Sequence, residues 1–233
     1  MSISVMKRYE LKYLLSGEQT RMLREKLAGH MEIDAYGKTS IASLYYDTPT
    51  YQLIRASLEK PAYKEKLRLR SYGPATEESP VFLELKRKAC GVVYKRRIQT
   101  TLPDARRFFT EKGETEENGQ IYRELSAFRD YYKTLRPTCL IIYDRTAYFE
   151  PGGDLRLTID EAPRYRVDDL TLTGSMDGIP LFEPGRTILE IKVQGAMPLW
   201  LNAILNECGI RKSGFSKYGE AYRRELMQTL VCA

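Results

Sequence analysis

The feature that most constrains this chain is an alternation of apolar and charged residues in several short segments. The clearest are Lys66–Arg70, Phe82–Lys86, Leu155–Asp160 and Leu189–Lys192. Side chains two residues apart on a β-strand point to the same face of a sheet. The alternation therefore predicts strands with one apolar and one ionic face. If the strands share a sheet, their ionic faces add up to one charged surface.

Most of the charges that align on this surface are cations. The same-face positions are Arg8, Glu10, Lys12, Lys66, Arg68, Arg70, Glu84, Lys86, Lys95, Arg97, Arg145, Arg156, Asp160, Glu190 and Lys192. Like charges that face one another on neighbouring strands repel and destabilise a sheet. The formal net charge of the whole chain is +6. Both observations predict an anionic ligand that offsets the repulsion.

Cysteine usage and the N-terminal residues indicate a cytoplasmic protein. The four cysteines are scattered, with no C-x-x-C pair, which is typical of reduced thiols rather than of a disulfide framework or a zinc site. The N-terminus lacks the apolar core and small-residue cleavage site of a signal peptide. No segment approaches the roughly 18 consecutive apolar residues of a membrane helix. We therefore expect no membrane segment.

Hydrophobic periodicity and turn residues predict a mixed α+β chain. The predicted strands cover residues 9–15, 41–47, 62–72, 80–88, 92–101, 138–149, 155–160 and 187–194, with one or two short strands between Tyr165 and Leu181. The predicted helices cover residues 16–28, 51–58, 120–135, 198–208 and 216–231, and the acidic stretch Glu111–Gly119 is predicted to be a loop. Because there is no repeat, linker or low-complexity segment, we expect a single domain over residues 1–233.

The number of strands makes closure into a barrel plausible. Strands joined by turns pair antiparallel, and about eight of them can close into a barrel with room for one small ligand. Helices packed outside would bury the leucines and leave the charges to line the bore. Unpaired charges in a dry core would cost on the order of tens of kcal/mol. We therefore expect a charged tunnel that is wet or filled by a polyanion.

Eight short motifs follow one another along nearly the whole chain. They are Arg8-Tyr9-Glu10-Leu11-Lys12-Tyr13, Leu44-Tyr45-Tyr46-Asp47-Thr48, Lys66-Leu67-Arg68-Leu69-Arg70, Leu83-Glu84-Leu85-Lys86, Tyr143-Asp144-Arg145, Leu155-Arg156-Leu157-Thr158-Ile159-Asp160, Leu189-Glu190-Ile191-Lys192 and Phe215-Ser216-Lys217-Tyr218. As an ordered set they resemble the VTC domain, a polyphosphate polymerase module of the triphosphate tunnel metalloenzyme (CYTH-like) superfamily. The resemblance implies a closed antiparallel β-barrel that forms a tunnel, with helices outside.

The resemblance also implies roles for the basic residues. It assigns the phosphate chemistry to a catalytic set of Lys12, Arg68, Arg70, Lys86, Arg145, Arg156 and Lys192. We expect four further residues to bind substrate: Lys66, Lys95, Ser216 and Lys217. Among these, Ser216 can cap a helix whose N-terminus is a natural phosphate site.

The resemblance further implies a divalent metal, Mn²⁺ or Mg²⁺, with Glu190 as its carboxylate ligand. Glu10 and Glu84 are additional metal candidates, although either could instead pair with a neighbouring lysine. The E-x-E-x-K signature of the hydrolase and cyclase branch is reduced here to Glu10-Leu11-Lys12, with Arg8 in place of the first glutamate. This exchange removes a carboxylate and adds a cation, which favours the polymerase branch.

The function expected from these features is transfer of the terminal phosphate of ATP onto a polyphosphate chain. Phosphoryl transfer needs positioned phosphates and neutralised charge more than covalent chemistry. With His30 as the single histidine, no His-dependent nucleophile or His-rich metal site can be built. The alternatives are a triphosphatase on the same scaffold and a non-catalytic module that binds polyphosphate or RNA. We expect a nucleoside triphosphate, triphosphate or polyphosphate as partner rather than a nucleic acid.

Overall fold

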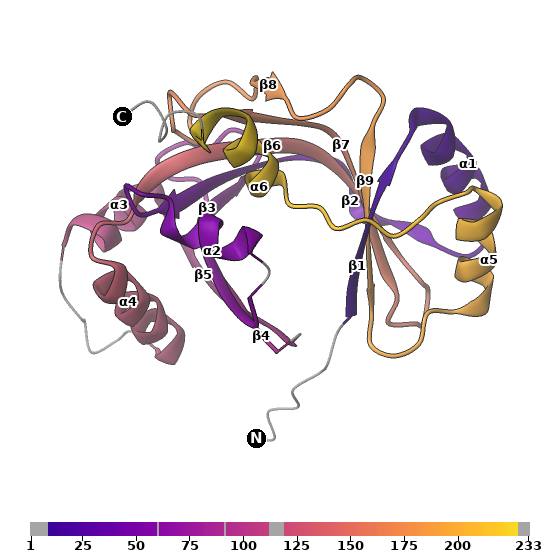
Figure 1. The fold of residues 1–233 in the computed structure, drawn as a ribbon, viewed down its shortest axis with the longest axis horizontal. Coiled ribbons are helices and arrows are strands. Elements are labelled where there is room, and N and C mark those ends of the chain that lie inside the picture. Colours follow the sequence, from indigo (N-terminus) through magenta and orange to yellow (C-terminus); the bar gives the residue numbers. More distant parts are fainter. Residues whose placement is uncertain (1–8, 60, 91, 112–118, 228–233) are drawn as a thin grey trace. The chain divides into compact units, whose positions relative to one another are not determined.

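The computed structural model describes residues 9–59, 61–90, 92–111 and 119–227 and shows an α+β fold (Figure 1). Its contacts divide the chain into two compact units. The first unit comprises Met1–Ser40, Tyr143–Pro163 and Pro180–Ser216, and the second comprises Ile41–Ile142, Arg164–Ile179 and Lys217–Ala233. The single domain expected over residues 1–233 stays a prediction.

Both units are built from strands and helices. The strands are β1 (Tyr9–Leu15), β2 (Glu32–Asp47), β3 (Tyr63–Tyr72), β4 (Val81–Ala89), β5 (Val92–Thr100), β6 (Arg136–Phe149), β7 (Arg156–Arg166), β8 (Ile179–Pro180) and β9 (Thr187–Val193). The helices are α1 (Gly17–Leu27), α2 (Gln52–Leu58), α3 (Leu102–Thr110), α4 (Gln120–Tyr132), α5 (Leu199–Glu207) and α6 (Lys217–Ala221), the last of which continues as a π-helix over Tyr222–Leu226.

The main difference from the sequence prediction is α3, which the prediction lacks. The Thr101 side chain accepts a hydrogen bond from the backbone of Asp104, and a proline stands in the first turn. Both are ordinary helix-start signals. The helix is short and runs into the acidic stretch, so its apolar stripe is brief. A second difference is the start of β2, which lies at Glu32 rather than at residue 41.

Three calls from the sequence fall outside the described residues. They are the role of Arg8, most of the loop predicted at Glu111–Gly119, and the end of the helix predicted over residues 216–231.

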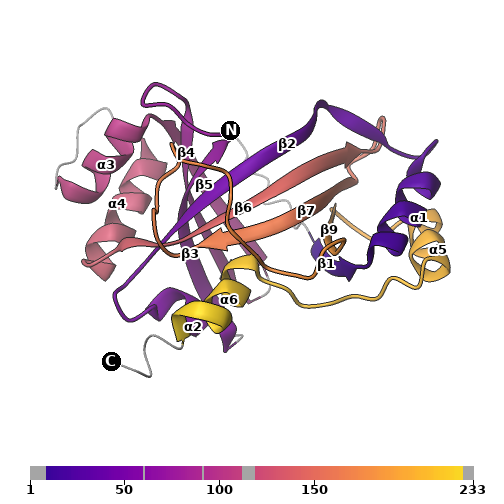
Figure 2. The same cartoon turned by 90° about the horizontal axis from the view of Figure 1, so that it is seen from above.

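In the first unit, β9 pairs antiparallel with both β1 and β7, so that Glu190 lies opposite Lys12 on one side and Thr158 on the other. Leu189 and Ile191, which alternate with these charged positions, are buried on the other face. Helices α1 and α5 lie side by side and contribute to the same apolar cluster (Figure 2). The predicted separation of apolar and ionic faces is therefore present in this unit.

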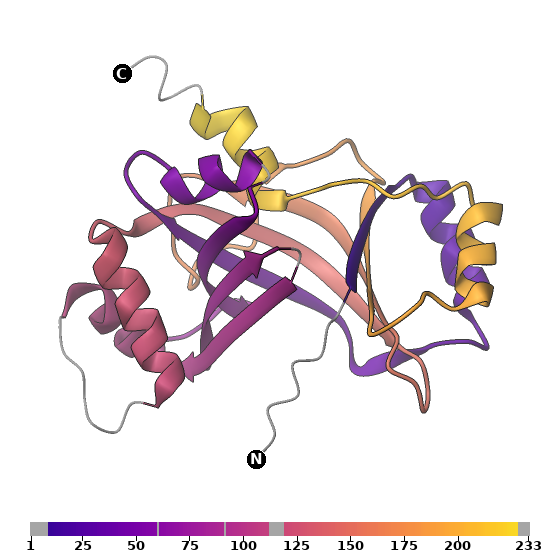
Figure 3. The ribbon, with the colours of Figure 1, turned by 60° about the horizontal axis from the view of Figure 1, so that its bottom comes forward.

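The second unit repeats the arrangement with β2, β3, β4 and β5, which pair antiparallel in this order. Leu67, Leu69, Leu83 and Leu85 face a buried cluster that includes Phe108 of α3 and residues of α4. Figure 3 shows α3 and α4 together beside these strands. The helices again cover the apolar face, and Lys66, Arg68, Arg70 and Glu84 occupy the opposite one. At the margin of the apolar face, Arg87 pairs with Glu65 and Arg96 with Glu124 of α4.

A buried carboxylate fixes the end of β2 in the second unit. Asp47, which is fully buried, accepts hydrogen bonds from the backbone N–H groups of Thr48, Leu53 and Ile54 and from the Tyr218 hydroxyl. Burial raises the pKa of Asp47, and the three backbone donors oppose this shift. The same carboxylate thus caps α2, whose first N–H groups need an acceptor, and anchors α6.

The closed barrel expected from the sequence is not observed, because the sheet is open. The strands pair in the order β1-β9-β7-β6-β2-β3-β4-β5, with β8 attached to β7. Within the described residues β1 and β5, the two ends of this order, do not pair with each other. The last strand, β5, carries Lys95, Arg96 and Arg97 in succession, and charges of this kind are typical of edge strands, where they oppose further pairing.

Among the helices in the described ranges, none is both long and apolar enough to cross a membrane.

Candidate functional site

The charged face of β3, β4 and β5 in the second unit is organised in rows across the strands. We call this surface the basic face; it comprises Lys66, Arg68, Arg70, Glu84, Lys86, Lys95 and Arg97. One row places Lys66, Lys86 and Lys95 directly opposite one another, and the next row places Arg68, Glu84 and Arg97. Directly opposite positions have Cβ atoms only about 5 Å apart. The row of lysines contains no carboxylate of its own, and Lys95 reaches Glu84 of the next row. The basic face therefore carries more cations than carboxylates, an excess that an anion would offset.

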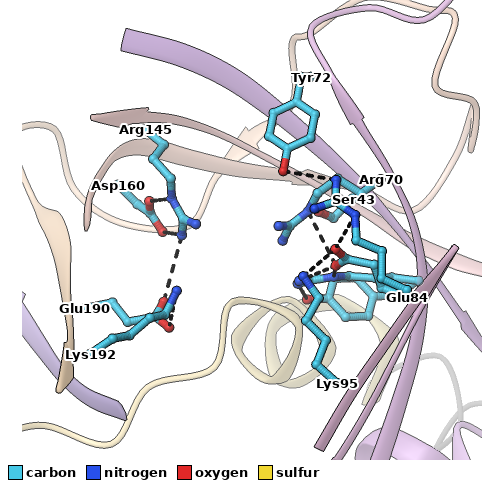
Figure 4. Close-up of polar contacts among 12 residues, drawn as sticks. Ser43, Arg70, Tyr72, Glu84, Lys95, Arg145, Asp160, Glu190 and Lys192 are labelled. Atoms are coloured by element: carbon cyan, nitrogen blue, oxygen red, sulfur yellow. Dashed lines mark hydrogen bonds and ion pairs between the residues drawn. The ribbon is translucent and has the colours of Figure 1, made fainter. Parts of the chain in front are cut away.

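Glu84 is the centre of the basic face. Its carboxylate accepts a hydrogen bond of 2.8 Å from Arg68 Nε and lies 2.6 Å from Lys95 Nζ. Arg70 Nε and Arg97 Nε lie 3.8 and 3.6 Å from its oxygens. One buried carboxylate therefore gathers four cations, as Figure 4 shows for Arg70 and Lys95.

The electrostatics of this cluster favour anion binding. Burial alone would raise the pKa of the Glu84 carboxyl, but Arg68, Arg70 and Lys95 hold it well below its ordinary value. Burial lowers the pKa of Lys95, and the Glu84 carboxylate opposes that shift. With Glu84 ionised, its single negative charge leaves the four surrounding cations with an excess of positive charge.

Two arginines of the basic face are also held from β2. Arg68 Nη1 donates to the Tyr45 hydroxyl at 3.1 Å, and Arg70 Nε donates to Ser43 Oγ at 3.3 Å. Tyr45 in turn stacks on Tyr218 of α6, with ring centroids 4.6 Å apart. Arg68 is thus fixed by a hydroxyl and a carboxylate at once, a rigid placement that suits bidentate recognition of phosphate.

The first unit carries a second charged cluster, which we call the carboxylate cluster; it comprises Glu10, Lys12, Arg145, Asp160, Glu190 and Lys192. Arg145 donates from Nε and Nη2 to the two oxygens of Asp160, at 2.6 and 2.8 Å (Figure 4). Its Nη2 also lies 3.8 Å from Glu190 Oε2, and Lys192 Nζ lies 3.7 Å from Glu190 Oε1.

Glu190 is the buried anion of this cluster, with a side chain 10% exposed. Burial would raise the pKa of the Glu190 carboxyl, but Lys192, Lys12, a hydrogen bond with Glu10 and Arg145 hold it well below its ordinary value. The Glu10 carboxyl therefore contacts that of Glu190, so two acidic groups meet on the same sheet face. Lys12 Nζ lies 3.4 Å from Glu10 Oε1.

This carboxyl pair has the donor chemistry that a divalent metal requires. Mg²⁺ and similar hard cations take oxygen ligands, often one or two carboxylates completed by substrate phosphates and water. Glu10 and Glu190 offer such a pair, with Glu190 ionised. Glu84 is less suited, because Arg68 and Lys95 already engage its two oxygens. Within the described residues no three acidic, histidine or cysteine side chains form a complete protein-only metal site, so a metal here would depend on substrate oxygens.

The paired hydrogen bonds of Arg145 lead to a stability prediction. Arg145→Lys keeps the charge but replaces the planar guanidinium by a single ammonium group. Asp160, which is fully buried, then loses one of the two hydrogen bonds that Arg145 donates to it. We expect the free energy of unfolding to fall by about 1–2 kcal/mol in urea denaturation. The matched control is Arg156→Lys, since Arg156 donates to the backbone carbonyls of Gly153 and Leu155 rather than to a buried carboxylate, and the change should alter stability by less than about 0.5 kcal/mol. An equal decrease in the free energy of unfolding in both variants would show that the paired hydrogen bonds of Arg145 add no stability.

The structure divides the residues predicted for the site between the two units. The basic face holds Lys66, Arg68, Arg70, Glu84, Lys86 and Lys95. The first unit holds Glu10, Lys12, Arg145, Arg156, Glu190 and Lys192, with Arg156 as the Cα partner of Lys192. Ser216 ends the last segment of the first unit, and Lys217 begins α6 in the second.

Sequence reasoning missed several residues that complete the basic face. Ser43 and Tyr45 hold its arginines from β2, and Tyr72 and Phe82 lie at its end. A signal was present, because Tyr72 is two residues after Arg70 and Phe82 two residues before Glu84. Side chains two residues apart on a strand point to the same face, so these aromatic residues lie on the basic face together with the charged ones.

Comparison with known proteins gives both a family and a fold. The VTC domain family matches residues 7–225 of this chain. A solved structure of a candidate adenylate cyclase from Bacillus halodurans is similar with a TM-score of 0.54 and 16% identity, over 91% of this chain and 96% of that one. The structure of HpAC1 from Hippeastrum, described as an adenylyl cyclase candidate with a dominant triphosphatase activity, is similar with a TM-score of 0.50 and 19% identity, over 94% of this chain and 95% of that one. A search of curated proteins finds no match.

Proposed function

The chain belongs to the VTC domain family, and on this premise we propose that it is a metal-dependent polyphosphate polymerase. In the proposed reaction the terminal phosphate of a nucleoside triphosphate, ATP in the simplest case, is transferred onto a polyphosphate chain. The bond broken joins the γ-phosphorus to its bridging oxygen, and the bond formed joins that phosphorus to a terminal oxygen of the acceptor chain. The nucleoside diphosphate leaves with the bridging oxygen.

The observation that carries this proposal is the excess of cations on the basic face. Lys66, Lys86 and Lys95 form one row across three strands, and the neighbouring row has two arginines around the single carboxylate of Glu84. Glu84 offsets part of the repulsion among these cations, and an anion that covers the surface would offset the remainder. A chain of phosphates supplies closely spaced negative charges that match a row of cations.

The proposed roles follow from the chemistry of each side chain. Arg68 and Arg70 would hold phosphate oxygens with planar forks, while the lysines of the basic face, and Lys217 at the start of α6, would act as point charges. Arg145 has Nε and Nη2 turned to carboxylates, so we propose that it fixes Asp160 and Glu190 while adding positive charge. Lys12, Arg156 and Lys192 would add further cations, and Ser216 a hydroxyl donor.

Glu190 and Glu10 would hold Mn²⁺ or Mg²⁺ in this proposal. When bound, the metal would neutralise charge that develops on the transferring phosphate. The chain itself need not supply a general base, because the terminal phosphate oxygen of the acceptor is already largely ionised near neutral pH. The protein's contribution is then to hold the donor and acceptor phosphates in the orientation that the transfer requires.

Product analysis tests this proposal. Purified protein is incubated with ATP and Mn²⁺, the products are separated on a polyacrylamide gel, and free phosphate is measured in parallel. A ladder of polyphosphate with stoichiometric ADP is the expected result. Free phosphate without polymer would instead assign triphosphatase activity, and binding of ATP without any product would assign a non-catalytic module.

We also propose a cytoplasmic location. The three cysteines in the described ranges, Cys90, Cys139 and Cys208, are free thiols, which is typical of a reducing compartment.

A further inference from the structure

An aromatic corner lies at the end of the basic face, next to Arg70. Tyr72 is the last residue of β3, and Phe82 of β4 is the Cα partner of Arg70. The two rings meet edge to face, with centroids 5.6 Å apart and an angle of 79° between the planes. Phe82 is half-buried, whereas Tyr72 is 47% exposed. An accessible aromatic ring therefore continues the line of charged side chains along β3 (Figure 4).

Arg97 holds this corner in place. Its guanidinium carbon lies 3.6 Å from the centroid of Phe82 and 5.8 Å from that of Tyr72, and Nη2 donates to the Tyr72 hydroxyl at 3.4 Å. Its Nε lies 3.6 Å from Glu84 Oε1. Arg97 covers the face of Phe82, so Tyr72 is the ring that offers surface to a ligand. The aromatic corner and the cation cluster thus share one residue.

The spacing along β3 matches a ligand that is charged at one end and aromatic at the other. Alternate residues on a strand are about 7 Å apart, so Tyr72 lies about 7 Å beyond Arg70 and about 13 Å beyond Arg68. The ribose and phosphate chain of a nucleotide can span such distances. An inorganic polyphosphate has no group that gains from an exposed ring.

We propose that Tyr72 stacks the base of a nucleoside triphosphate whose phosphates lie on the basic face. This inference rests on the proposed function and adds to it a nucleotide-selecting residue. Stacking of a base on an aromatic side chain is tolerant of base identity, because every base has a π-face. The corner would therefore favour nucleotides over inorganic triphosphate without strong preference among bases.

Calorimetric titration of the full chain with ATP and with tripolyphosphate tests the stacking. The variants are Tyr72→Ala and Tyr72→Phe, and the control is Tyr94→Ala. Tyr94 is a tyrosine of the same sheet, 39% exposed, but it pairs with Arg87 on the opposite face. Tyr72→Ala should raise the Kd for ATP about tenfold, equivalent to ~1.4 kcal/mol. Its Kd for tripolyphosphate should stay within about twofold.

The other variants make the result specific. Tyr72→Phe retains the ring and should bind both ligands within about twofold of the wild type, as should Tyr94→Ala. Equal weakening of ATP and tripolyphosphate by Tyr72→Ala, or no weakening of ATP, would overturn the stacking role while leaving the proposed function in place. A wild-type protein that binds neither ligand would overturn the proposed function itself, and the stacking role with it.

Discussion

Replacement of Glu190 by glutamine should reduce metal-dependent turnover of ATP by about 100-fold or more. The substitution keeps the shape of the side chain and removes the ionised carboxylate that we propose, with Glu10, as the metal ligand in the carboxylate cluster. A bound metal contributes several kcal/mol of charge stabilisation to the transition state, and each ~1.4 kcal/mol corresponds to a factor of ten in rate. The measurement is kcat for ATP as a function of Mn²⁺ and Mg²⁺ concentration.

Two comparisons separate a metal-ligand role from a structural role of Glu190. Binding of tripolyphosphate in the absence of metal should be unchanged or tighter in Glu190→Gln, because the carboxylate cluster has lost one negative charge that would repel the ligand. Glu161→Gln is the matched control, since Glu161 also lies in the first unit and pairs with two cations, Arg24 and Lys38. Full turnover in Glu190→Gln with the same metal requirement would move the metal site elsewhere.

Replacement of Glu84 by glutamine should lower the free energy of unfolding by about 3–5 kcal/mol at neutral pH, as expected when one partner of a buried ion cluster is removed. Four cations would then face one another without their shared anion. Urea denaturation measures the loss. The control is Glu77→Gln, which breaks an exposed pair with Arg106 and should cost less than about 1 kcal/mol. Tripolyphosphate should restore more stability to Glu84→Gln than to the wild type, because it replaces the missing negative charge.

The depressed pKa of Glu84 also sets the sign of a pH dependence. A carboxyl whose pKa is lower in the folded than in the unfolded state stabilises the fold above its unfolded pKa, about 4.3. This contribution is lost as the pH falls below that value toward the folded pKa. The wild type should therefore lose stability more steeply than Glu84→Gln between about pH 4.5 and 2. Parallel losses in the two proteins would show that Glu84 is not held ionised by its neighbours.

Much of the fold could be predicted because apolar and charged residues alternate along several of its strands. In β3, Leu67 and Leu69 are buried while Arg68 and its even-numbered neighbours take the charged face, as the period of two requires. The start of β1 and the capping box of Ser16 with Gln19 are similarly local signals. Closure of the sheet is different, because it depends on how far the strands are staggered and twisted. No local sequence pattern in β1 or β5 indicates the stagger or the twist of the strands.

The candidate site shows the same division. The alternation of side chains along each strand assigns Arg68 and Glu84 to the charged face. The register of β3 with β4 then places them opposite each other. The alternation does not reveal that four cations surround the Glu84 carboxylate, since this depends on the lengths and directions of their side chains. It also does not show that Tyr45 holds Arg68, because the register of β2 against β3 is set by contacts distant in sequence.

The most direct measurement of the central claim is thermal unfolding of the wild type with increasing tripolyphosphate, with AMP as the comparison. A ligand that relieves repulsion among cations of the native state binds the folded protein alone. At 100 times its Kd it should add about 2.7 kcal/mol of stability, which would raise Tm by roughly 5–10 °C for a chain of this size. AMP, with one phosphate, should raise Tm by less than about 1 °C on the same scale. Equal shifts for the two ligands, or no shift with tripolyphosphate, would contradict a surface built to bind a chain of phosphates.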